Sequence, residues 1–355
     1  MKEALDFIVI GAQKAGTSSL FHYLRHHPEV AVPAGKEAPF FSHDFEYARG
    51  FAAYMSELRG EIADPDPSSK WGTVTPHYTA GNVWYADAEA RRSYDEHTVP
   101  LRIRDQLPDV RLIAILRDPV ERAVSGHREL VMLGFDRRPF DTAMQDLLRE
   151  DALEHARARP ELATSYVVWG EYGRILTGYF DVFRREQILV VFTDELHADP
   201  ARLLNRVQNF IGVKADFLPS NLGEKYNAGI VVRPFSWTRP STWTSPYSPL
   251  SPQGLQLALR RNAAARAAWH MVPYARRRRL KARYNRIARR IVLRNAERGR
   301  DQVSEETLGR LREHYAADTL QLAALLGSSP PWQVPVRQAE ALASRSGPES
   351  GAAGE

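Results

Sequence analysis

Short apolar runs alternate with amphipathic stretches along the first two thirds of the chain. Three of these runs, Phe7–Ile10, Leu112–Leu116 and Ile188–Phe192, are apolar at every position and are bounded by polar or turn residues. Uninterrupted apolar runs of this length are typical of strands that are buried on both faces of a parallel sheet. We therefore expect these three segments to be core strands of one sheet.

Helical patterns follow or precede each of these strands. Pro119 suits the first position of a helix, where its missing N–H is not needed. The predicted helices cover Thr17–His27, Pro119–Leu133, Ser165–Arg185 and Ala201–Ile211, and less regular patterns predict a helix over Tyr47–Leu58 and a strand over Trp71–Val74. Alternating strands and helices predict an α/β protein with a P-loop-like, three-layer fold, in which helices flank a central parallel sheet.

These patterns divide the chain into four parts. Residues 1–234 form the α/β core, and residues 304–327, opened by Ser304, form a helix that closes it. Residues 235–303 combine an irregular Pro-, Ser- and Trp-rich segment with a basic helical insertion. Residues 328–355 are small, polar and Pro-rich, and we expect them to be disordered.

Composition narrows the class of protein. The chain has no cysteine, which excludes disulfides, thiolate nucleophiles and cysteine-bound zinc. It has no apolar run of about 18 residues that could span a bilayer. The segment Met1–Asp6 is too short and too acidic for a signal peptide. A cytoplasmic enzyme is the expectation.

The net charge of +5 is unevenly distributed. Residues 260–300 contain fifteen Arg and Lys and one acid, so this segment carries +14 and the rest of the chain −9. Three interpretations remain open: a solvated helical face, a site for an anionic acceptor such as a polysaccharide or an acidic lipid head group, and peripheral attachment to a membrane surface. Nucleic acid is the least favoured partner, because aromatic residues are sparse there and no nucleic-acid motif accompanies them.

The loop after the first strand has the composition of a phosphate-binding turn. Its sequence is Gly11-Ala-Gln-Lys14-Ala15-Gly16-Thr17-Ser18-Ser19. Glycines let the backbone turn tightly and bring N–H groups close to an anion, and the N-terminus of the next helix adds a favourable dipole. Lys14 supplies a mobile positive charge, while Thr17 and Ser18 supply hydroxyl donors. The alternative is a capped strand–helix turn without a ligand.

This loop departs from the Walker A motif, G-x-x-x-x-G-K-[ST]. The lysine of that motif follows the second glycine, whereas here Thr17 follows it and the lysine is Lys14. The second strand ends in Leu116-Arg117-Asp118-Pro119, and an arginine at this edge of the sheet suits a second phosphate better than a metal ion. An atypical P-loop kinase is therefore a less favoured alternative, and we expect no metal.

Two motifs in this order resemble the sulfotransferases that use 3′-phosphoadenosine 5′-phosphosulfate (PAPS), most closely the branch of heparan-sulfate sulfotransferases and their soluble bacterial relatives. Residues 7–20, with Leu24 and residues 27–30, resemble the family's 5′-phosphosulfate loop and first helix. Residues 116–125 resemble its 3′-phosphate element, in which the equivalents of Arg117 and Ser125 contact the 3′-phosphate.

The resemblance implies a sulfuryl transfer from PAPS, with 3′,5′-ADP as the product, to a hydroxyl or amine of a carbohydrate, lipid or small-metabolite acceptor. It assigns PAPS binding to Gly11, Lys14, Ala15, Gly16, Thr17, Ser18, Ser19, Arg117, Ser125 and Lys225. Lys225 belongs to a loose match to the loop that closes over the nucleotide in relatives. Several relatives carry a lysine where this chain has Val74, and Lys70 lies four residues upstream.

The resemblance also implies catalytic residues for this in-line displacement. Residues 36–41 resemble the segment that carries the family's catalytic glutamate, which makes Glu37 the general base. Its aromatic neighbours could raise the pKa of this carboxyl by desolvation. His77, in the Thr-Pro-x-Tyr-like element 72–78, and His43 are rival bases, because an imidazole needs less tuning of its pKa. Lys14 assists the leaving phosphate.

Two arginines have alternative roles in the second motif. Arg117 could pair with Asp118 or Glu121 instead of a phosphate, and Arg122 is expected to form a structural i, i+4 pair with Asp118. A protein that kept the fold but only binds anionic surfaces is the non-enzymatic alternative to the sulfotransferase.

Overall fold

The computed structural model describes residues 3–62, 66, 68–80, 96–132, 136, 138–161, 164–224, 226, 231–232, 271–272, 276, 280, 296–297 and 303–332. Lys225, nearly all of the basic stretch 260–300 and residues 333–355 lie outside this set, as do the predictions made for them. Within the described part of the chain, no helix is both long enough and apolar enough to cross a membrane.

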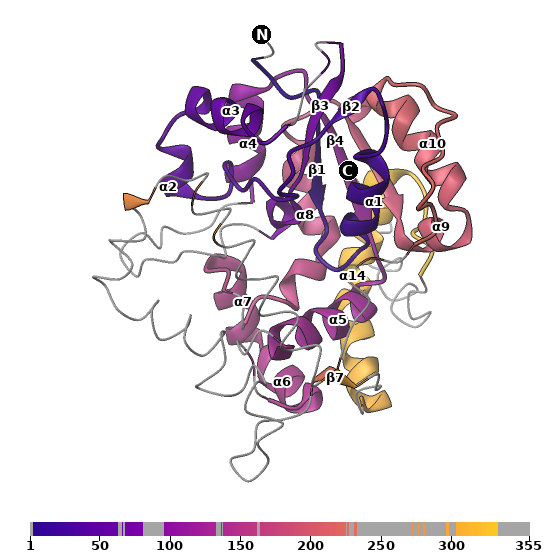
Figure 1. The fold of residues 1–355 in the computed structure, drawn as a ribbon. Coiled ribbons are helices and arrows are strands. Elements are labelled where there is room, and N and C mark those ends of the chain that lie inside the picture. Colours follow the sequence, from indigo (N-terminus) through magenta and orange to yellow (C-terminus); the bar gives the residue numbers. More distant parts are fainter. Residues whose placement is uncertain are drawn as a thin grey trace, which may run out of the picture.

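Five parallel strands form the central sheet, in the order β2-β3-β1-β4-β5 (Figure 1). The strands are β1 (Phe7–Gly11), β2 (Val30–Ala31), β3 (Lys70–Val74), β4 (Arg111–Leu116) and β5 (Ile188–Phe192). Their parallel pairing confirms the predicted fold class. The strand predicted over Trp71–Val74 is present as β3, whereas β2 has only two residues and no pattern that would predict it.

Helices cover both faces of the sheet. They are α1 (Thr17–Leu24), α2 (Asp44–Tyr47), α3 (Phe51–Arg59), α4 (Thr98–Gln106), α5 (Pro119–Met132), α6 (Phe140–Leu147), α7 (Glu150–Ala158), α8 (Tyr172–Phe180), α9 (Thr193–Ala198), α10 (Pro200–Ile211) and α14 (Glu305–Leu326). Short 3₁₀ helices are η1 (Pro76–Thr79), η2 (Val168–Gly170) and η3 (Arg185–Gln187), and a small antiparallel pair joins β6 (Val231–Val232) to β7 (Ala296–Glu297).

The alternation of side chains along the central strands produces two cores. Ile8 and Ile10 of β1 face α3, α4 and α8, whereas Phe7 and Val9 face α1, α9 and α10. These residues are fully buried, as expected for a strand covered on both sides. A third apolar cluster lies among α5, α6, α7 and α14, beyond the carboxyl ends of the strands (Figure 1).

Two predicted helices are interrupted in the structure. The helix predicted over Tyr47–Leu58 is split into α2 and α3 at Gly50, whose φ of 86° is a left-handed conformation that favours glycine. The helix predicted over Ser165–Arg185 is split into η2 and α8 at Glu171, whose ψ of 69° is not helical. Glu171 is held in this position by side-chain contacts with α7 and α14. Those contacts come from distant segments, so the local pattern could not predict the break.

The helix α14 packs against α8 and α5. Ser304 caps it by accepting a hydrogen bond from the backbone N–H of Thr307. Gly173 of α8 lies so close to α14 that a Cβ there would stand 2.4 Å from the carbonyl oxygen of Asp318. Trp332, at the start of the predicted tail, packs against the rings of Tyr172 and Phe192.

Candidate active site at the carboxyl edge of the sheet

Within the described part of the chain, the predicted site residues come from the segments that follow β1, β2, β3 and β4, which are neighbours in the sheet. In an open parallel sheet, the carboxyl edge is where ligands bind. The phosphate-type loop follows β1, the Thr75-Pro76 element follows β3, and Arg117 follows β4. The topology therefore brings together three motifs that are far apart in the sequence.

The loop after β1 has two residues in a left-handed backbone conformation. Lys14 has a φ of 68° and Gly16 a φ of 99°, both in the left-handed region, and Gly16 precedes the first turn of α1. The loop is fixed to the sheet, because the backbone N–H of Ala12 donates to the carbonyl of Ile115 at 2.7 Å. The Thr193 hydroxyl also donates to the carbonyl of Ala15 at 2.6 Å.

Gly11 permits a close approach between this loop and the element after β3. A Cβ at this position would lie 2.2 Å from Oγ1 of Thr79, far inside van der Waals contact. The glycine at the start of the motif therefore allows η1, with its histidine, to lie directly against the loop.

Lys14 is directed toward α5. Its Nζ lies 3.2 Å from Oε1 of Glu129, and Nε2 of Gln13 donates to the other oxygen of the same carboxylate at 3.1 Å. The Lys14 side chain is only 14% exposed. The lysine that the sequence singled out is thus largely shielded from water and paired with a carboxylate that the sequence analysis did not single out.

Arg117 also rests on α5. Its Nε and terminal nitrogen donate to Oε2 of Glu121 at 2.9 and 2.7 Å. Glu121 is one of the two acids that the sequence offered as partners of Arg117. Glu121, Ser125 and Glu129 follow one another at i, i+4 spacing, so they share one face of α5. Ser125 therefore lies between the two carboxylates that hold the predicted phosphate-binding cations.

The predicted ion pair between Arg122 and Asp118 is wrong. The carboxylate of Asp118 caps α5 by accepting the backbone N–H groups of Val120 and Glu121. The Arg122 side chain is fully buried and donates to the carbonyl of Tyr166. Its role is structural, as expected, because it joins α5 to the backbone at Tyr166. The carboxylate of Asp118 serves as the helix cap instead.

Glu37 and His77 lie together. Oε2 of Glu37 is 3.1 Å from Nε2 of His77, which is the donor because a carboxylate only accepts. The His77 side chain is 4% exposed, whereas that of Glu37 is 42% exposed. The buried imidazole of His77 therefore hydrogen-bonds to the carboxylate of Glu37, which is partly exposed to solvent. His43, the other rival base, is buried at the start of α2.

The segment around Glu37 is fastened to the element after β3. The backbone N–H of Ala38 donates to the hydroxyl of Thr75 at 3.0 Å, and the Tyr78 hydroxyl donates to the carbonyl of Ala38 at 2.5 Å. Phe40 and Phe41 are buried and pack against other aromatic rings. The rings thus anchor the segment in the core, while the Glu37 carboxylate makes polar contacts with His77 and Lys36.

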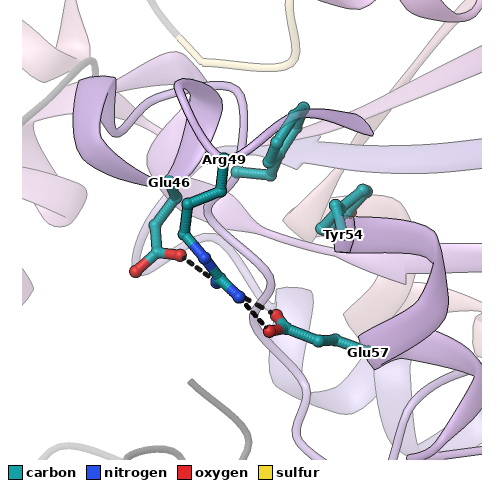
Figure 2. Close-up of a pocket in the computed structure, with 5 residues that line it drawn as sticks. Glu46, Arg49, Tyr54 and Glu57 are labelled. Atoms are coloured by element: carbon teal, nitrogen blue, oxygen red, sulfur yellow. Dashed lines mark hydrogen bonds and ion pairs between the residues drawn. The ribbon is translucent and has the colours of Figure 1, made fainter. Parts of the chain in front are cut away.

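A small hollow behind this segment is closed by charged side chains (Figure 2). Arg49 donates to Glu46 at 2.8 Å and makes two hydrogen bonds to Glu57, which raise the pKa of the guanidinium. Phe40 and Tyr54 form the apolar wall and stack at a centroid distance of 4.5 Å. These contacts join α2 to α3 and stabilise the base of the Glu37 segment.

Lys36 was not predicted as a site residue, yet the structure places it at the loop. Its Nζ lies 3.1 Å from the hydroxyl oxygens of both Thr17 and Ser18, and 3.8 Å from Oε1 of Glu37. Burial lowers the pKa of this ammonium, an effect that the charge of Lys14 reinforces and that nearby carboxylates oppose. A contact between side chains nearly twenty positions apart has no local sequence signal.

Lys70 does not reach the site. Its Nζ pairs with Oδ1 of Asp6 at 3.3 Å, and both residues stand at the amino end of the sheet. The loop at residues 221–226, by contrast, returns to α1. The carbonyl of Glu224 accepts from Tyr23, and the backbone N–H of Tyr226 donates to Ser19. Both neighbours of Lys225 in the sequence therefore contact the first helix.

This sheet, its glycine-containing loop and its cationic carboxyl edge define an α/β protein of the P-loop-like class. Within that class, residues 5–226 match the family described as the sulfotransferase domain, and the chain belongs to this family. In the part of the chain described here, no three His, Asp or Glu side chains are grouped in a way that could hold a metal ion.

Curated relatives agree with this membership. The chain is 30% identical over 207 residues to heparan sulfate glucosamine 3-O-sulfotransferase 6 of Homo sapiens, which covers 58% of this chain and 52% of the relative. It is 30% identical over 213 residues to heparan sulfate glucosamine 3-O-sulfotransferase 3B1 of Mus musculus, covering 60% and 47%. The chain thus spans about half the length of these relatives.

A solved structure supports the fold. A sulfotransferase from Alicyclobacillus acidocaldarius superposes with a TM-score of 0.57 at 21% sequence identity, over 92% of this chain and 97% of that one. At this level of identity the likeness concerns the architecture alone.

Proposed function

We propose that the chain is a PAPS-dependent sulfotransferase that transfers the sulfuryl group to a hydroxyl or amine. The observation that carries this proposal is the pair of cations, Lys14 and Arg117, on one face of α5. Each is held by a carboxylate, Glu129 or Glu121, and phosphate groups are competing anionic partners. Two anion sites flanking Ser125 fit a nucleotide with phosphates on both its 5′ and 3′ sides.

The 5′ end would bind in the first loop. The residues proposed for it are Gly11, Lys14, Ala15, Gly16, Thr17, Ser18 and Ser19, and the left-handed turn at Gly16 supports them. Arg117 and Ser125 would bind the 3′-phosphate. Lys225 is proposed to close over the nucleotide, because the residues on either side of it contact α1.

The chemistry would be an in-line displacement at sulfur. Glu37 takes the acceptor proton as the new S–O or S–N bond forms, and the phosphate of 3′,5′-ADP departs with the electron pair of the broken S–O bond. Lys14 and the backbone N–H groups of the loop stabilise the charge on that phosphate. His77 positions the base through its hydrogen bond and remains the rival base.

The acceptor is proposed from the site and from the relatives. Glu37 is partly exposed at the sheet edge, which suits an acceptor that approaches from solvent. The relatives are named for a heparan sulfate glucosamine acceptor, which supports a carbohydrate hydroxyl or amine as the first acceptor class to test. An anionic acceptor would favour a role for the basic residues 260–300.

Calorimetry with 3′,5′-ADP tests the nucleotide site. We expect binding without Mg²⁺, and we expect Lys14→Ala and Arg117→Ala each to weaken it by at least about tenfold, because each removes one charge-assisted contact. Lys70→Ala is the matched control, since it removes a lysine paired with a carboxylate at the opposite edge of the sheet. A PAPS-consumption screen over carbohydrate, phenolic and lipid acceptors then tests turnover.

Two results would contradict the proposal. Transfer of the γ-phosphate of ATP in the presence of Mg²⁺, without binding of 3′,5′-ADP, would favour the kinase. Polyanion or lipid binding that persists in a Lys14→Ala, Glu37→Ala double variant, with no turnover in the parent protein, would favour a non-catalytic surface binder.

Replacing Glu129 with glutamine should have the opposite effect on affinity. The substitution removes the carboxylate that competes for Lys14, so 3′,5′-ADP should bind about three- to tenfold more tightly. Isothermal titration of the two proteins at the same ionic strength measures this. Glu313→Gln, on the exposed surface of α14, changes the net charge equally and should leave the affinity unchanged. Weaker binding in Glu129→Gln would mean that this carboxylate orders the loop instead.

A further inference from the structure

Lys36 stands between the two halves of the proposed site. It follows β2 by a few residues, and its ammonium reaches the first turn of α1, where it donates to the hydroxyls of Thr17 and Ser18. On its other side, Oε1 of Glu37 lies 3.8 Å away. One side chain therefore contacts the phosphate-type loop and the proposed base at the same time.

The surroundings of Lys36 favour an anionic ligand. Its side chain is 19% exposed, so the ammonium has lost much of its hydration. Its two shortest contacts are with neutral hydroxyls, and the nearest carboxylate is beyond direct hydrogen-bonding distance. Burial lowers the pKa of this ammonium, and the charge of Lys14 adds to that effect. Glu37 and Glu129 also act on Lys36, so an anion bound at this helix N-terminus would compete with these carboxylates for the two ammonium groups.

No other described lysine offers this charge at the loop besides Lys14. The position before Thr75 is Val74, which is fully buried, and Lys70 is paired at the opposite edge of the sheet. Lys214 is exposed and lies near Asp216. Within the residues whose placement is described, Lys36 is thus the second ammonium available to a group bound in the loop.

We propose that Lys36 binds the phosphosulfate end of the nucleotide and contacts the group that is being transferred. This inference rests on the proposed sulfotransferase function. The ammonium donates hydrogen bonds to non-bridging oxygens of the phosphosulfate and keeps its proton throughout. As the S–O bond to the phosphate breaks, negative charge grows on the phosphate, and Lys36 stabilises it together with Lys14.

The same ammonium would act on the base. Its positive charge beside Glu37 favours the ionised carboxylate, which is the form that accepts the acceptor proton. Lys36 would therefore contribute to turnover more than to ground-state binding of the product, because 3′,5′-ADP lacks the sulfuryl group. This difference separates Lys36 from Arg117, which is proposed to contact only the 3′-phosphate.

The test compares Lys36→Met, Lys36→Arg and Lys70→Met. We expect Lys36→Met to lower kcat for sulfuryl transfer by about 10²-fold, with a loss of affinity for 3′,5′-ADP below about tenfold. Lys36→Arg should recover at least about tenfold of the lost kcat, because it restores the positive charge. Lys70→Met should match the parent protein in both measurements. Thermal unfolding followed by circular dichroism identifies variants that do not fold. If Lys36→Met does not fold, the kcat and affinity of Lys36→Arg are compared with those of the parent protein instead.

A pH profile distinguishes binding from mere positioning. A lysine with a lowered pKa loses its charge as the pH rises, so the kcat of the parent should fall on the alkaline side. Lys36→Arg should remove this alkaline fall, because arginine stays charged. If Lys36→Met keeps kcat and affinity within about twofold of the parent, the inference about Lys36 fails while the proposed sulfotransferase function stands. If the parent protein neither binds 3′,5′-ADP nor consumes PAPS, the proposed function fails and this inference fails with it.

Discussion

Glu37→Gln should lower kcat for sulfuryl transfer by about 10³-fold while leaving the affinity for 3′,5′-ADP within about twofold. Glutamine has the size of glutamate and its amide oxygen can still accept the hydrogen bond from His77, so the local geometry is preserved. What is lost is the ability to take a proton from the acceptor. Steady-state PAPS consumption and calorimetry on the same preparation measure the two quantities.

His77→Gln is the matched control for this experiment. If Glu37 is the base, this variant loses only the group that positions the carboxylate, and its kcat should fall less than that of Glu37→Gln. Full activity in Glu37→Gln together with a large loss in His77→Gln would assign the proton transfer to the imidazole. The buried position of His77, at 4% exposure, makes it a better support than an entry point for an acceptor.

Glu171→Ala should lower the free energy of unfolding by about 3–5 kcal/mol. Its carboxylate is 3% exposed, and it pairs with Arg157 at 2.9 Å, Arg174 at 2.7 Å and His314 at 3.1 Å. Removal of the acid leaves these basic groups without their shared partner at the junction of α7, α8 and α14. Urea denaturation at pH 7 measures the loss. Glu150→Ala, at 78% exposure and 3.9 Å from Arg157, should cost less than about 1 kcal/mol.

The same carboxylate predicts an acid limb in the stability profile. Burial alone would raise the pKa of Glu171, but the contacts with His314 and Arg157 and the charge of Arg174 outweigh it and lower the pKa to about 2. Because the folded pKa lies below the ordinary value of 4.5, this contribution is present above pH 4.5 and is lost as the pH falls from 4.5 toward 2. Glu171→Gln should flatten the unfolding free energy across that window. A profile unchanged from the parent would show that other acids govern acid denaturation.

The strands and the first loop could be predicted from local sequence. Phe7–Ile10 and Ile188–Phe192 are apolar at every position because both faces of the sheet are covered, and glycine positions mark the turn after β1. Elements whose ends depend on distant contacts could not be predicted. The break at Glu171 depends on Arg157 and His314 from other helices.

The residues of the candidate site also divide into those with a signal in the local sequence and those placed by distant contacts. Arg117 and Ser125 were indicated by the resemblance of residues 116–125 to the family's 3′-phosphate element. Lys36 and Glu129 had no such signal, since Lys36 contacts α1 from the next loop and Glu129 contacts Lys14 across the sheet edge. Asp118 was mispredicted because the i, i+4 rule favoured an ion pair, whereas the open N–H groups at the start of α5 bind its carboxylate.

The pairing of Lys14 and Arg117 with carboxylates of α5 has a consequence for the proposed nucleotide site. Glu121 and Glu129 both stand on α5, roughly 12 Å apart along its axis at about 1.5 Å per residue. The helix therefore fixes the separation of the two cations, because neither can shift toward the other without leaving its carboxylate. A ligand whose phosphates are joined in a single chain, such as ATP, would then bind one of the two cations and leave the other paired with its carboxylate on α5.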